Sequence, residues 1–265
     1  MIFKLLILLL NTGILVHSDS IETGVKPFNE SANMVYGWNL EISKERWRGV
    51  CFGTFIAPQV YITDPVCLES INHVDENSII IISKGYRGNK TRDDISVHFM
   101  NIFYSEDLDR TFNRNKRKIA VVIIDEPVRP EQDKNGYVKI NSNLNDIDTK
   151  KCYVPHYNNW DTTRFTYCDH VLFDNHYGNP VNIYCVSSEN VDKLGSGLFC
   201  ALKTNPDVNV LVGIIVGPNN GIKLWNDPNR FIATVENLSG LYDPIMDIAN
   251  IFARVLRKYK TSYFK

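Results

Sequence analysis

The sequence predicts an all-β fold that ends in one α-helix. Residues 38–42, Trp-Asn-Leu-Glu-Ile, alternate apolar and polar side chains, the pattern of a strand with one buried face. Residues 78–83 and 95–103 are further strand candidates, and the first of them is strongly β-branched. Near the C-terminus, Asp243-Pro244 offers a helix N-cap and a first-turn proline, and the apolar residues that follow fall on one helical face.

The N-terminus has the composition of a secretion signal. Lys4 precedes an apolar run at residues 5–10 that resumes at 14–16, and small or apolar residues stand at the expected cleavage positions. We therefore expect a signal peptide at 1–18, a polar segment at 19–33 and a secreted, extracellular protein. The run is interrupted and shorter than the ~20 residues that a bilayer span needs, so we expect no membrane span.

The net charge disfavours some classes of partner. The formal charge of the 265 residues is −1, and losing Lys4 with the signal peptide makes it −2, because residues 1–18 hold no other charged side chain. This balance argues against a general nucleic-acid or membrane-surface binder. We expect no nucleic-acid partner and no cofactor.

The six cysteines behind a signal peptide predict a disulfide-bonded protein, although spacing alone leaves many pairings open. A zinc site is the alternative. It is poorly supported, because no two cysteines lie two to four residues apart.

Three motifs resemble one known family. Residues 192–200, Asp-Lys-Leu-Gly-Ser-Gly-Leu-Phe-Cys, and the apolar run at 210–217 resemble the nucleophile loop and following strand of the trypsin-like serine proteases. Residues 51–63, Cys-Phe-Gly-Thr-Phe-Ile-Ala-Pro-Gln-Val-Tyr-Ile-Thr, resemble the strand pair before that family's catalytic histidine, and this is the most specific match. Residues 119–128 resemble the segment after the family's catalytic aspartate.

The resemblance covers about residues 34–260 and implies one domain at 34–265. It implies two packed six-stranded antiparallel β-barrels, the first at about 34–130 and the second at about 131–240, and a C-terminal helix at about 243–259. Residues 129–151, rich in polar side chains, are expected to form an exposed crossing between the two halves.

The family's catalytic positions are all substituted. By the resemblance, Leu194 stands for the nucleophilic serine, Val66 for the histidine and Lys118 for the aspartate. The family's mechanism needs a hydroxyl that attacks, an imidazole that carries its proton and a carboxylate that holds the imidazole. Leucine and valine can do neither of the first two tasks. The resemblance therefore implies a homologue without protease activity.

The resemblance also selects a disulfide pairing. It implies that Cys51 pairs with Cys67, Cys152 with Cys200, and Cys168 with Cys185.

The family's activation switch is expected to be absent. No basic residue stands directly before Ile21, near which a new amino terminus would have to form, and Lys193 replaces the aspartate that would receive that terminus. The substrate-binding edge is altered too, because Pro218 cannot donate a backbone hydrogen bond. Ser188 would lie at the base of the specificity pocket.

Two other chemical interpretations of the residues are open. Ser196 could be a displaced nucleophile, which would need a base within hydrogen-bond reach, or an ordinary loop serine. His170 and His176, near Asp169 and Asp174, could suggest a metal site, but the spacing fits no standard ligand pattern.

The sequence also contains a run of basic residues and three glycosylation sequons. The run is a possible binding patch for a sulfated glycan or an acidic protein, or a solvated loop; it comprises Arg110, Arg114, Lys116, Arg117 and Lys118. Part of it, residues 114–117, also resembles a proprotein-convertase site. The glycosylation sequons begin at Asn29, Asn89 and Asn237.

Three functions are compatible with the sequence. The first is a binding module that engages an extracellular protease, inhibitor or receptor and regulates it. The second is a serine-type endopeptidase with unrecognised catalytic residues. The third is a structural secreted glycoprotein.

Overall fold

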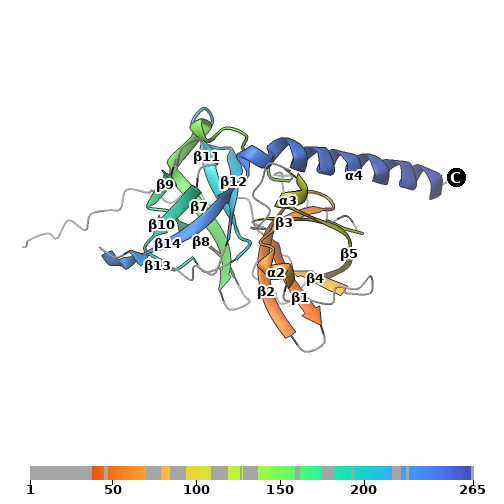
Figure 1. The fold of residues 1–265 in the computed structure, drawn as a ribbon, viewed down its shortest axis with the longest axis horizontal. Helices are drawn as coiled ribbons and strands as arrows, with labels where there is room; N and C mark the ends of the chain where they lie inside the picture. Colours follow the sequence, from red (N-terminus) through yellow and green to blue (C-terminus); the bar gives the residue numbers. More distant parts are fainter. Residues whose placement is uncertain are drawn as a thin grey trace, which may run out of the picture.

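The protein consists mostly of β-strands in two antiparallel sheets, with one long helix at the C-terminus (Figure 1). The structure is a computed structural model. It describes residues 38–44, 47–69, 79–83, 94–108, 119–125, 127, 137–158, 162–174, 182–191, 194–216, 222–224 and 227–263.

The first sheet is a closed six-stranded barrel, with the strands in the order β1-β2-β3-β6-β5-β4. Neighbouring strands in this order are antiparallel throughout. The predicted strands at 78–83 and 95–103 are confirmed as β4 and β5. The six strands are β1 (Trp38–Lys44), β2 (Trp47–Ala57), β3 (Val60–Thr63), β4 (Ile79–Ser83), β5 (Asp94–Tyr104) and β6 (Ala120–Ile124).

Strand β3 shows how alternation distributes the core. Val60 and Ile62 belong to the core cluster shared with the second sheet, whereas Tyr61 points to the opposite face and packs its ring 5.0 Å from that of Phe55. A Cβ atom at Gly53, across the sheet, would collide with the Tyr61 ring. A large aromatic side chain here therefore requires glycine on the neighbouring strand.

The second sheet has eight strands, not the six expected. The hydrogen-bonded path runs β8-β7-β11-β12-β14-β10-β9, and β13 pairs with β14 beside it. The short strands β9 and β13 each pair antiparallel with a neighbour. The eight are β7 (Ile147–Asn158), β8 (Thr162–Tyr167), β9 (His170–Asp174), β10 (Asn182–Ser187), β11 (Gly197–Leu202), β12 (Asn209–Ile215), β13 (Ile222–Leu224) and β14 (Asp227–Asn237).

Two disulfides cross-link the second sheet, and both confirm the predicted pairing. Cys152 and Cys200 stand opposite each other on β7 and β11 and are bonded, and Cys168 is bonded to Cys185. All four residues are buried. Cys67 is disulfide-bonded as well; the side chain of its predicted partner, Cys51, lies outside those that the structure describes.

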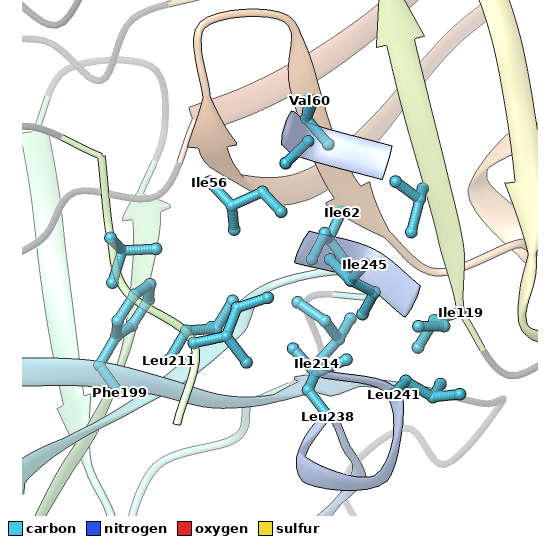
Figure 2. Packing of buried hydrophobic residues seen from close by; sticks show 14 of the residues in the cluster. Ile56, Val60, Ile62, Ile119, Phe199, Leu211, Ile214, Leu238, Leu241 and Ile245 are labelled. Carbon is cyan, nitrogen blue, oxygen red and sulfur yellow. The ribbon is translucent and has the colours of Figure 1, made fainter. Parts of the chain in front are cut away.

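A continuous apolar cluster joins the two sheets (Figure 2). The rings of Tyr153 and Phe199 stack within it at 5.7 Å. Because this cluster draws on β3 and β6 of the barrel and on β7, β11 and β12 of the second sheet, the two halves share one core. Its buried members are Ile56, Val60, Ile62, Ile119, Val121, Ile123, Val138, Ile140, Tyr153, Phe199, Leu211, Ile214, Leu238, Leu241, Ile245 and Ala249.

The expectation that residues 129–151 form an exposed crossing is only partly correct for the described part, in which polar residues such as Lys139 and Asn145 are exposed but two apolar residues are not. Val138 and Ile140 are buried in the shared core. Backbone hydrogen bonds hold this segment against β12: Leu211 N donates to Lys139 O and Asn141 N donates to Leu211 O, both at 2.8 Å. The segment is polar in overall composition, but Val138 and Ile140 stand two residues apart, as on one face of a strand, and this face is buried.

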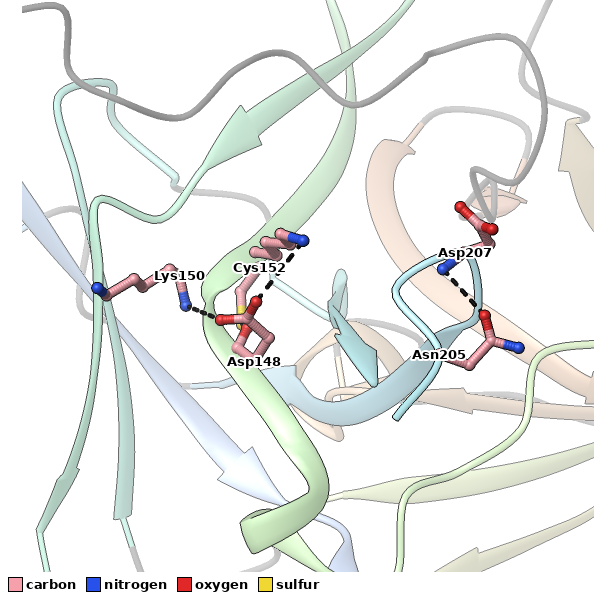
Figure 3. A network of polar contacts seen from close by, with 6 residues as sticks. Asp148, Lys150, Cys152, Asn205 and Asp207 are labelled. Carbon is pink, nitrogen blue, oxygen red and sulfur yellow. Dashed lines mark hydrogen bonds and ion pairs between the residues drawn. The ribbon is translucent and has the colours of Figure 1, made fainter. Parts of the chain in front are cut away.

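The start of β7 is held at the surface by polar contacts, in contrast to the apolar core (Figure 3). After the 3-10 helix η1 (Leu144–Asp146), the Asp148 carboxylate accepts from Lys150 N at 3.1 Å and pairs with Lys151 Nζ at 3.8 Å. Because Lys151 and Asp148 are partly exposed, this ion pair contributes little stability.

The described helices are short except the last. They are α2 (Val66–Glu69), α3 (Ser105–Leu108) and α4 (Tyr242–Tyr263), and the 3-10 turn η2 (Ser239–Leu241) leads into α4. The helix α4 continues past the expected end at residue 259, because neither glycine nor proline interrupts it between Pro244 and Tyr263. Within the described residues, no helix is both long and apolar enough to cross a bilayer.

Candidate functional site

The fold brings two of the three positions singled out by the resemblance to the junction between the halves. Val66 is the first residue of α2 on the barrel, and Leu194 lies in the turn before β11 of the second sheet. The carbonyl oxygen of Leu194 accepts a hydrogen bond from Phe52 N at 3.1 Å and lies 3.8 Å from Cys67 Sγ. Lys118 lies outside the described residues.

The turn at residues 194–196, between the two halves, requires glycine at position 195. The φ angle of Gly195 is +82°, a conformation that favours glycine, and a Cβ atom there would collide with the carbonyl oxygen of Phe52. Gly195 N donates to Ile215 O at 2.9 Å, and Ile215 N donates to Ser196 O at 2.8 Å. The turn is thus fixed by β2 on one side and by β12 on the other.

Asp64 positions Val66, a role that the sequence motifs did not reveal. The Asp64 side chain is buried, and its Oδ1 accepts from Val66 N at 2.7 Å, while Pro65 occupies the helix start. An aspartate followed by proline is a favourable start for a helix. Val66 itself is 48 % exposed, so this site presents an apolar side chain to solvent.

Neither side chain at the junction can take part in acyl transfer. Valine and leucine carry no lone pair and no exchangeable proton, so they supply neither a base nor a nucleophile. Asp64 carries a carboxylate close by, but this residue is buried and its Oδ1 accepts a hydrogen bond from Val66 N at the start of α2. Its role is therefore structural. The described part of the junction offers backbone atoms and apolar surface.

Ser196 does not replace the missing nucleophile. It is 2 % exposed, and its Oγ has no hydrogen-bond partner among the described residues. A nucleophile must reach the substrate and be close to a base, and Ser196 meets neither condition here.

The histidine alternative also gains no support. His170 is exposed on β9, and His176 lies outside the described residues. Among the residues that the structure describes, no three His, Cys, Asp or Glu side chains are grouped so that they could hold a metal ion.

The loop after β10 contains polar contacts that the sequence did not suggest. Ser188 is exposed, whereas the neighbouring Ser187 is buried and its Oγ donates to Glu189 O at 2.5 Å. Thr166 Oγ1 donates to the Glu189 carboxylate at 3.1 Å.

The predicted substrate-binding edge is described only in part. Val216 follows β12 directly, and its N–H donates to Thr234 O at 3.0 Å; Pro218 lies outside the described residues.

Several predicted features lie outside the described residues: the signal peptide, Ile21, Lys193, the sequons at Asn29 and Asn89, and the basic run from Arg110 to Lys118. The ends of the connection that contains the basic run are described. Tyr104 on β5 pairs with Ala120 on β6, and Ser105 N donates to Ile119 O at 3.1 Å. The segment between β5 and β6 therefore begins and ends at paired residues.

The third sequon is expected to stay unmodified. Asn237 is 9 % exposed at the end of β14, and its Oδ1 accepts a hydrogen bond from Ser239 N at 2.9 Å. A glycan is bulky and needs a surface position. Ser239→Ala removes the sequon but keeps Asn237, so we expect the glycan mass of the secreted protein to be unchanged. A loss of one glycan in this variant, measured by intact mass spectrometry, would contradict the expectation.

Comparison of the chain with protein-family models finds no match, and comparison with curated proteins finds no significant relative.

Proposed function

We propose that the protein is a trypsin-like serine protease homologue without catalytic activity that acts as an extracellular binding module. The observation that carries the proposal is the pair Val66 and Leu194. These two residues, which stand for the family's histidine and serine, come from opposite halves of the molecule and lie at one junction, and neither supplies protease chemistry.

The surroundings of the pair support a binding role. The disulfides are compatible with an extracellular protein. Among the side chains whose exposure the structure describes, three large apolar ones are notably exposed: Val66, Leu172 and Ile251. An exposed apolar residue beside a rigid turn can contribute to a protein interface, where apolar anchors provide much of the affinity.

The first test of this proposal is chemical. Fluorophosphonate probes label an activated serine hydroxyl, so the purified protein should stay unlabelled under conditions in which trypsin is labelled completely. Leu194→Ser should also stay unlabelled, because Val66 cannot accept the proton of the new hydroxyl. Stoichiometric labelling of the unaltered protein would disprove the proposal in favour of an endopeptidase with unrecognised residues.

The binding role is tested with a matched pair of variants. Val66→Glu places a charge on the proposed face, and Leu172→Glu places the same charge on a similarly exposed apolar residue of β9; the two side chains are 48 % and 51 % exposed. For a partner captured from the native extracellular fluid, we expect Val66→Glu to weaken binding at least about tenfold and Leu172→Glu to leave it unchanged. Equal effects of the two substitutions, or no selective partner, would favour a structural glycoprotein.

A further inference from the structure

We draw no further inference here: the strongest candidate, the apolar surface patch formed by Leu172 on β9 and the opposite Tyr184 on β10, carries none, because nothing among the described residues shows what covers it.

Discussion

Replacing Gly195 by alanine should destabilise the protein by about 3 kcal/mol, a large effect for the addition of one methyl group. The φ angle of +82° already disfavours any residue with a Cβ atom. The Cβ would also collide with the carbonyl oxygen of Phe52, which belongs to the backbone of β2 and cannot rotate away as a side chain could. Relief of the collision requires the turn to withdraw from the barrel, and this breaks the hydrogen bond between Phe52 N and Leu194 O.

The matched control for this prediction is Gly240→Ala. Gly240 lies in η2 and is exposed, and a Cβ atom at this position would have no neighbouring atom within 4 Å, so the substitution should change stability by less than about 0.5 kcal/mol. Urea unfolding of the two variants and the unaltered protein measures the difference. Similar midpoints for Gly195→Ala and Gly240→Ala would show that the 194–196 turn does not fix the junction.

Removal of the Cys152–Cys200 disulfide, by Cys152→Ser with Cys200→Ser, should cost about 2 to 5 kcal/mol and visibly reduce secretion. Both residues are buried, so the variant also places two hydroxyls among apolar neighbours. Because 48 residues separate these cysteines and 17 separate Cys168 from Cys185, chain entropy predicts that the second disulfide contributes about 1 kcal/mol less.

The comparison of the two double variants tests this order. Unfolding free energies and secreted yields should both place the Cys168→Ser, Cys185→Ser variant between the unaltered protein and the Cys152→Ser, Cys200→Ser variant. The reverse order would show that local packing, and not loop length, sets the contribution of each disulfide.

Much of the fold followed from residue patterns with short range. The β-branched residues of β4, the alternation in β1 and the apolar spacing in α4 predicted their elements, because side-chain periodicity selects backbone geometry locally. The predicted N-cap, Asp243, instead lies inside α4, which begins at Tyr242. Two disulfide pairings were predicted through the resemblance to a known family and are present in the structure. Cysteine spacing by itself could not have chosen them.

The candidate site was likewise predicted from the sequence only in part. Val66 and Leu194 were singled out from sequence motifs, but their meeting at one junction depends on the packing of the barrel against the second sheet. Asp64 was not singled out, although Asp64-Pro65 is the same pair of residues as Asp243-Pro244, because the helix that follows it has only four residues and is too short to leave an apolar pattern in the sequence. Its role became clear from its burial and its hydrogen bond to Val66 N.

The sequence by itself determined that the chain forms strands and a terminal helix, and that Val66, Lys118 and Leu194 stand at the three positions that a resemblance alone compares with a protease triad. Only the tertiary structure decided that Val138 and Ile140 are buried, that the second sheet has eight strands, and that Gly195 must lack a side chain. The physical reason is one of range. Alternation and capping act between residues close in sequence, whereas burial, strand count and the collision at Gly195 depend on segments that come together only when the chain folds.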